Sequence, residues 1–246
     1  MNWKFWERGP KHDVEFIDTT RAVYQVHPIE LAKPTRPFFY KDMMQEYGEY
    51  MFAKCPGMID LKNYGYIIPA WDDIHIKANK AGVVAHVGGG SRPSRFAQAR
   101  PMDGRVVKGV FTPEGGVPMQ PIHVGSPWSI FVHNKNMSVA LMPAFFHSPF
   151  LDDLYVFPGL VDYGKFTTMN FIFACKRPCE LTIKVGTPLL QALPFESKHI
   201  KAGYGPADDY QVDMTKSIYS SSKQFYRKYI MHDKKSSIES IEESSK

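Results

Sequence analysis

The sequence predicts a mainly β protein: an antiparallel β-clip or jelly-roll-like barrel or sandwich, with one helix before the core and one after it. From residue 122 to 195, short runs rich in β-branched and aromatic residues follow one another, and turn-forming residues separate most of them. This spacing is typical of antiparallel sandwiches and barrels. The composition, 43% hydrophobic and 22% charged over 246 residues, excludes disorder, collagen and coiled coil as overall descriptions. The length favours one core with additions over two domains.

Residues 1–58 form the predicted N-terminal extension. Alternating apolar and polar residues predict strands at 14–17 and 22–26. A helix is expected at 41–54, where apolar residues recur at helical spacing, and the Cys-Pro-Gly sequence that follows is expected to end it. Two strands and one helix therefore precede the core.

The β core is expected over residues 59–200. Its β-rich runs are separated by glycine, proline, asparagine and aspartate, which mark turns. The predicted strands lie at 66–69, 74–77, 82–87, 128–133, 138–142, 154–157, 167–174, 180–185 and 189–195.

A glycine- and proline-rich basic loop interrupts this core at 88–118, where only 106–111 has the pattern of a strand. A loop of this length is usually functional or disordered. Residues 77–108 hold seven lysines or arginines and one acid, whereas the whole chain carries a net charge of only +5. Because arginines among glycines can wrap phosphate, we expect Arg92 and Arg95 to contact a phosphate-bearing or acidic partner. A solvated loop is the alternative.

Beyond the core, a helical segment is expected at 201–232, followed by a disordered tail at 233–246 that is rich in serine and charge. Apolar residues recur at roughly helical intervals in 217–230. No run approaches the roughly 20 apolar residues of a membrane span, and no secretory pattern opens the chain. Three cysteines make no disulfide framework. We therefore expect a cytoplasmic protein with no membrane partner.

The residue pattern predicts no metal or other cofactor. Cys175 and Cys179 flank a predicted hairpin turn, but structural zinc needs four ligands and the sequence has no second thiol pair. The histidines stand singly in the predicted strands, which favours partly buried sheet residues over ligands. Adjacent aspartates at 72–73, 152–153 and 208–209 fall at predicted turns, where solvated carboxylates are common.

Residues 157–195 resemble the third and fourth motifs of the dUTPase and dCTP deaminase group. The sequence Pro-Gly-Leu-Val-Asp-Tyr-Gly begins at Pro158, two predicted strands follow, and Gly-Thr-Pro-Leu-Leu-Gln-Ala-Leu begins at Gly186. In that group, a Gly-aliphatic-aliphatic-Asp turn leads through two strands to a Gly-x-x-aliphatic-aliphatic-Gln strand. The resemblance covers only this part of the chain.

The resemblance implies a role for three residues. Asp162 would activate water, Tyr163 would lie near the base of a nucleotide, and Gln191 would contact phosphate. A carboxylate on a tight turn can act as a general base when a metal ion, here Mg²⁺, handles the phosphate charge. The group's Arg-Ser-Ser-type phosphate segment is replaced by residues 143–148, and its glycine-rich C-terminal arm is missing. The alternative is an aspartate that caps its own turn and an ordinary strand glutamine.

A broader resemblance links the chain to an uncharacterised protein family of marine tailed phages, including cyanophages. It rests on residues 55–60, 65–73, 127–128 and 186–189, which read Cys-Pro-Gly-Met-Ile-Asp, Gly-Tyr-Ile-Ile-Pro-Ala-Trp-Asp-Asp, Pro-Trp and Gly-Thr-Pro-Leu. That family lends no activity and no site residues. It implies a viral or prophage setting, and hence the host cytoplasm.

Two functions from different classes follow. The first is a non-catalytic phage-type β module for binding or assembly, which forms a homo-oligomer and meets its partner through the basic loop. The second is a divergent Mg²⁺-dependent nucleotide hydrolase with Asp162 as general base. An arginine-containing pocket lined by Asp162 and Gln191 would favour the hydrolase. An Asp162 that caps its own turn on a closed surface would favour the binding module.

Overall fold

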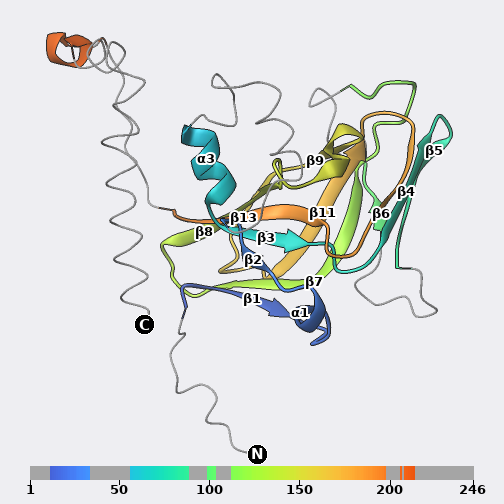
Figure 1. Cartoon of the computed structure of the whole chain (residues 1–246), viewed down its shortest axis with the longest axis horizontal. Coiled ribbons are helices and arrows are strands. Elements are labelled where there is room, and N and C mark those ends of the chain that lie inside the picture. Colours follow the sequence, from blue (N-terminus) through green and yellow to red (C-terminus); the bar gives the residue numbers. More distant parts are fainter. Residues whose placement is uncertain are drawn as a thin grey trace, which may run out of the picture. The chain divides into compact units, whose positions relative to one another are not determined.

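The computed structural model describes residues 12–33, 56–88, 99–103, 112–197, 206 and 208–213. It is mainly β, as predicted, with three antiparallel sheets and a few short helices (Figure 1). The chain divides into two compact units, residues 1–198 and 199–246. All described strands belong to the first unit. In the second, the N–H of Val212 donates to the carbonyl of Asp208 within a single helical turn.

The first sheet is built around its longest strand, β7. The order is β1-β7-β11-β9, and β6 also pairs with β7. One edge of β7 meets β11, while β6 and β1 share the other edge because they pair with its first and second halves. The strands are β1 (Val14–Asp18), β6 (Ala99–Pro101), β7 (Ile122–Val132), β9 (Leu154–Val156) and β11 (Thr168–Cys175).

The second sheet also has five strands, in the order β10-β8-β13-β3-β2. From β7 to β11, consecutive strands alternate between the first sheet and the second. The strands are β2 (Glu30–Leu31), β3 (Tyr66–Pro69), β8 (Met137–Pro143), β10 (Gly159–Val161) and β13 (Pro188–Glu196).

The third sheet has three strands in the order β12-β4-β5. β4 (Ile74–Asn79) and β5 (Gly82–Val87) form a hairpin, and β12 (Cys179–Ile183) pairs with the other edge of β4. In the hairpin turn, the side-chain oxygen of Asn79 accepts a hydrogen bond from the N–H of Ala81 at 2.8 Å. β5 is therefore an edge strand.

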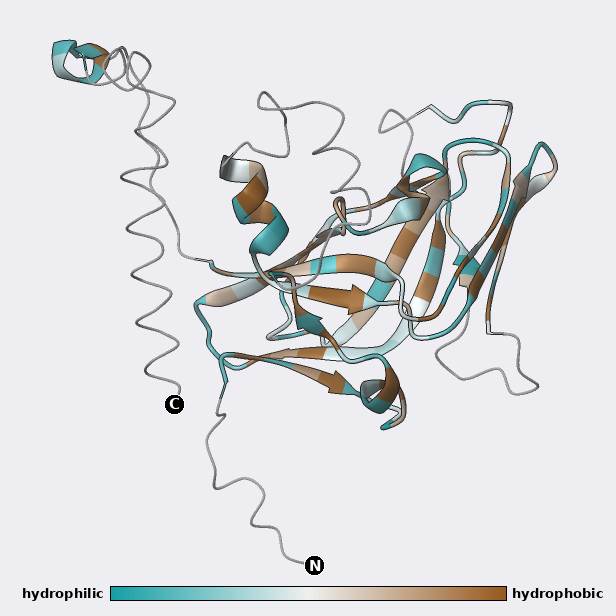
Figure 2. Ribbon diagram, viewed as in Figure 1, coloured by the Kyte–Doolittle hydropathy of each residue, from teal (hydrophilic) through white to brown (hydrophobic). Residues whose placement is uncertain are grey.

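A single apolar core joins the three sheets. From Ile122 to Ile130 every second residue of β7 is buried, the period of two expected when one face is covered, and only Pro127 is buried out of phase. Figure 2 shows the hydrophobic bands along the strands. Burial of each large side chain stabilises the fold by roughly 1.5–3 kcal/mol. The largest wholly buried side chains include Trp128, Tyr163, Phe171 and Phe173.

The predicted strand at 22–26 was wrong, because Val23–Val26 forms the one-turn helix α1. The physical reason lies in Asp18. Its carboxylate accepts hydrogen bonds from the backbone N–H groups of Thr20 at 2.8 Å and Tyr24 at 2.9 Å. In a strand, these two N–H groups would need acceptors on a neighbouring strand. Here the carboxylate of Asp18 accepts from both, which favours a turn.

The second helix, α3 (Pro56–Asn63), begins where the Cys-Pro-Gly sequence was expected to end one. Proline is well suited to the first turn of a helix, because the N–H that it lacks would have no partner there. Figure 1 shows α3 beside β13 and β3 of the second sheet. A 3₁₀ turn, η5 (Pro149–Asp152), precedes β9. The helix predicted at 41–54 lies outside the described residues.

The strands predicted between 59 and 200 are present with small shifts of their ends, apart from 106–111, which is not described. β7 extends upstream of its predicted start, and β6 and β10 were not predicted. The segment 217–230, the tail and both Arg92 and Arg95 also lie outside the described residues. Within the described part, no helix is long and apolar enough to span a membrane.

Candidate binding groove

Asp162 lies in the turn between β10 and β11, with an exposed side chain. One carboxylate oxygen, Oδ1, accepts a hydrogen bond from the N–H of Gly164 at 3.2 Å, and the other, Oδ2, lies 2.9 Å from Nζ of Lys165. Its backbone carbonyl accepts from the N–H groups of Lys165 and Phe166. The bond with Lys165 holds the pKa of Asp162 below its ordinary value. The residue therefore caps its own turn as a carboxylate.

Gln191 is buried in β13, and both N–H groups of its side-chain amide have partners within the fold. The amide nitrogen Nε2 donates one hydrogen bond to the carbonyl of Leu61 and another to the carbonyl of Tyr64, each at 2.6 Å. These carbonyls lie at the C-terminal end of α3, where the last carbonyls of a helix lack partners within it. Gln191 thus fastens α3 to the second sheet.

Tyr163 follows Asp162 directly, yet its ring lies in the core with 2% of the residue exposed. Burial raises the pKa of its phenol above the ordinary value. A wholly buried ring offers no face for a nucleotide base. The register also separates the other two candidate residues. Val161 of β10 pairs with Val139 of β8, which pairs with Pro194 of β13, so β10 lies two strand spacings from β13. Because Pro194 is three positions beyond Gln191, the Cα atoms of Asp162 and Gln191 are about 15 Å apart.

The paired aspartates are more firmly held than solvated turn residues would be. Asp73 accepts hydrogen bonds from Nζ of Lys184 at 2.8 Å and from the N–H of Val185 at 2.9 Å. Asp153 accepts from Nε of Arg177 at 2.7 Å. Both carboxylates therefore tie loops together across the sequence.

The two thiols that the structure describes show no sign of activation. Cys175 is buried at the end of β11, and burial raises the pKa of its thiol. Burial also raises the pKa of Cys179, which is half-buried. A buried thiol with a raised pKa is a poor nucleophile and a poor metal ligand. Among the described residues, no group of three or more His, Cys, Asp or Glu side chains is arranged to hold a metal ion.

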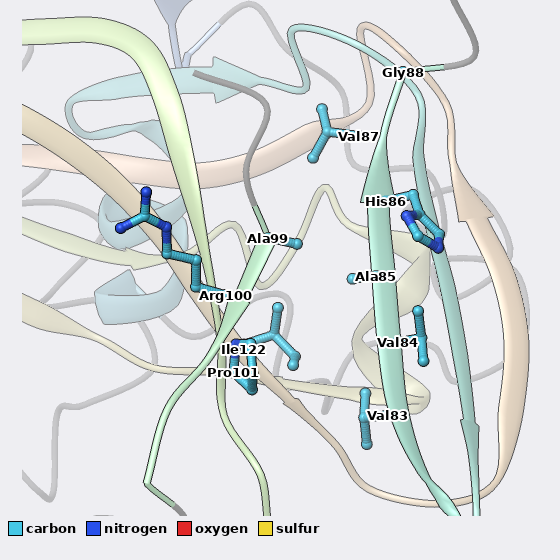
Figure 3. A pocket seen from close by; sticks show the side chains of 10 residues that line it. All are labelled: Val83, Val84, Ala85, His86, Val87, Gly88, Ala99, Arg100, Pro101 and Ile122. Atoms are coloured by element: carbon cyan, nitrogen blue, oxygen red, sulfur yellow. The ribbon is translucent and has the colours of Figure 1, made fainter. Parts of the chain in front are cut away.

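A concavity of the described surface lies between β5 and β6 (Figure 3). Its volume is about 680 Å³, within the range of ordinary ligand sites. It is lined by Val83, Val84, Ala85, His86, Val87, Gly88, Ala99, Arg100, Pro101 and Ile122. A second cavity, beside β2 and β3, holds about 170 Å³.

The two faces of β5 differ, because successive side chains of a strand alternate. Val87 and Ala85 point toward β6, and Ala99 points back toward β5, so small apolar side chains face each other across the groove (Figure 3). His86 projects on the other face of β5. Arg100 points away from β5.

The two strands beside the groove also have free edges among the described strands. β5 pairs only with β4, and β6 only with β7, so among the described strands each has one unpaired edge. The Cα atoms of the two strands come within 8 Å of each other, whereas paired strands lie about 4.8 Å apart. The sequence predicted β5 but gave no signal for the three-residue β6, and so the groove could not be foreseen.

Comparisons of the chain with protein-family models, with curated proteins and with solved structures find no match.

Proposed function

We propose that the protein is a non-catalytic β module for binding or assembly, of the phage type implied by the sequence resemblance, and that its partner occupies the groove between β5 and β6. The observation that carries the proposal is that two strands, each with an edge that pairs with no described strand, flank a groove in which small apolar side chains face each other. An unpaired edge is a template for another strand. Peptide recognition uses such edges by adding a strand to the sheet.

We also propose that the core of the mainly β fold is a jelly roll to which further strands are added. The strand orders β3-β13-β8-β10 and β7-β11-β9 support it, because consecutive strands alternate between two sheets and the last strand returns beside the first. β4, β5, β6 and β12 are then additions to the wrapped core. Jelly rolls occur in viral capsid and lectin domains, which bind and assemble without catalysis.

The surroundings of the hydrolase candidates also support a non-catalytic role. The Gln191 amide already donates both of its hydrogen bonds, so it has no proton left for a phosphate oxygen. Asp162 is held by its own turn and by Lys165. No contact among the described residues favours the nucleotide hydrolase.

The partner we propose is an extended acidic peptide segment. The edge of β5 offers backbone hydrogen bonds, and Val87 and Ala85 offer small apolar contacts at every second position. Residues 77–108 carry seven basic residues and one acid, which favours acidic over basic partners. A strand bonded to both edges needs about 9.6 Å between them. The partner therefore pairs with β5 alone and lies over Ala99.

The proposal also includes a homo-oligomeric protein that works in the host cytoplasm.

Fluorescence anisotropy with a labelled (Val-Glu)₄ peptide tests this function, with (Val-Lys)₄ as the charge control. We expect the acidic peptide to bind and the basic peptide not to. Ala99→Glu, which places a charge in the groove, should weaken binding at least tenfold. Val84→Glu makes the same charge change on the other face of β5 and should weaken it far less. Equal binding of both peptides, or equal effects of both variants, would overturn the groove assignment.

Thermal unfolding with nucleoside triphosphates, with and without Mg²⁺, tests the catalytic alternative. A ligand that binds only the native state raises the unfolding temperature. We expect no Mg²⁺-dependent rise for any nucleotide. A rise that disappears in Asp162→Ala would instead favour the hydrolase over the binding module.

A further inference from the structure

The outer face of the third sheet carries a histidine from each strand of its hairpin. His75 of β4 is the register partner of His86 of β5, and Thr182 of β12 is the partner of His75 on the other side. Residues directly opposite each other project on the same face. The neighbouring Ile74 and Ile76 face the core, so the row of Thr182, His75 and His86 faces outward, away from the groove.

A hydrogen bond fixes the ring of His75. Its Nδ1 lies 2.9 Å from Oγ1 of Thr182. When Nδ1 carries the proton and donates it to this hydroxyl, Nε2 presents its lone pair. Histidines that bind metals usually donate their other ring N–H to a neighbour in this way, which fixes both the tautomer and the ring orientation.

The spacing of the two strands suits a shared ion. Directly opposed residues of an antiparallel pair have Cβ atoms about 4.5–5.5 Å apart. Two imidazole nitrogens at about 2.0–2.1 Å from one tetrahedral ion are roughly 3.3 Å apart, which side-chain rotation on such Cβ atoms can reach. Figure 3 shows the His86 ring projecting from the face of β5 that points away from β6, and the register places His75 on the same face of the sheet.

The charges around the row do not repel a cation. Lys77, in the next row of the same face, is paired with Glu180 at 3.0 Å. The carboxylate of Asp73 lies close enough to His75 for the two to interact electrostatically. Asp73 itself is bonded to Lys184. The net charge of the side chains around His75 and His86 is therefore close to zero.

We propose that His75 and His86 together bind one divalent transition-metal ion of the zinc class through their ring nitrogens, with water in the remaining positions. Imidazole is a ligand that suits Zn²⁺, Ni²⁺ and Cu²⁺. Two histidines fill only two of the four positions around a tetrahedral ion. The other two positions are left for water or for a donor from another molecule. The proposal is independent of the groove, which lies on the opposite face of β5.

Calorimetric titration of the full chain with ZnCl₂ tests the proposal. We expect the wild-type chain to bind one Zn²⁺ ion. The affinity for this ion should fall at least tenfold in His75→Gln and by the same factor in His86→Gln. The matched control is His123→Gln, which removes a strand histidine of the first sheet and should leave this affinity unchanged. Circular dichroism spectra confirm that the variants fold.

Imidazole ¹⁵N spectra identify the ligands and separate this site from zinc binding by the cysteines. Zinc should shift the ring nitrogens of His75 and His86 together, at one equivalent. Unchanged ring signals of these two histidines, or an affinity that both variants leave intact, would overturn the proposal.

Discussion

Replacement of Gln191 by leucine should loosen α3 from the second sheet. The change keeps a side chain of similar size and removes both hydrogen bonds to the carbonyls of Leu61 and Tyr64. Each such bond contributes about 0.5–1.5 kcal/mol net, and a carbonyl that loses its partner inside the fold adds to the cost. The carbonyl of Leu61 keeps a bond from the N–H of Tyr64 at 3.4 Å, so this added cost falls mainly on the carbonyl of Tyr64. We therefore expect the free energy of unfolding to fall by about 2–3 kcal/mol. For a unit of this size, that is a drop of roughly 4–12 °C in the unfolding temperature.

Urea titration followed by tryptophan fluorescence measures this loss, and limited proteolysis reports whether cleavage begins within α3. Gln25→Leu is the matched control, because Gln25 is exposed on α1 and its change should leave the urea midpoint unchanged. A Gln191→Leu protein with wild-type stability would refute the reasoning. It would show that this amide is free for another role, as the resemblance to the dUTPase group implies.

Burial lowers the pKa of His147 below its ordinary 6.5 and outweighs a hydrogen bond with the backbone of Lys62, which acts in the opposite direction. Below about pH 6.5 the unfolded chain therefore binds more protons than the folded chain. The urea midpoint should fall as the pH drops from 7.5 to 5, and it should fall less steeply in His147→Phe. Gly65 has φ +78° and a Cβ there would collide with the carbonyl of Ala192, so Gly65→Ala should cost at least about 2 kcal/mol in urea titration. Gly57 has open space around it in α3, and Gly57→Ala should instead stabilise by about 0.5–1 kcal/mol; equal effects of the two changes would contradict this backbone argument.

The strands of the core could be predicted because burial of one face imposes a period of two that the sequence records. β8 and β13 were found almost to their ends. Val23–Val26 shows the limit of that signal, because its apolar alternation is overridden by the carboxylate of Asp18. A side chain that reaches back to backbone donors leaves little trace in hydrophobic pattern.

The candidate residues show why a motif can locate a turn without locating a site. Asp162 does lie in a turn and Gln191 in a strand, as their sequence contexts suggest. Their partners, however, come from elsewhere: Gln191 bonds to α3, more than 120 positions upstream. The groove depends on a short strand, β6, that is stabilised by pairing with β7 rather than by its own residues. Such long-range pairings are not encoded in local spacing.

Hydrogen exchange of the β5 backbone, with and without the (Val-Glu)₄ peptide, tests the central claim most directly. In the free protein, those amides of Gly82–Val87 that are not bonded to β4 should exchange rapidly, because the outer edge pairs with no described strand. Saturating peptide should protect these amides and leave the central amides of β8 unchanged. Binding of the peptide without protection of β5, or with protection confined to another strand, would contradict the assignment of the groove as the binding surface.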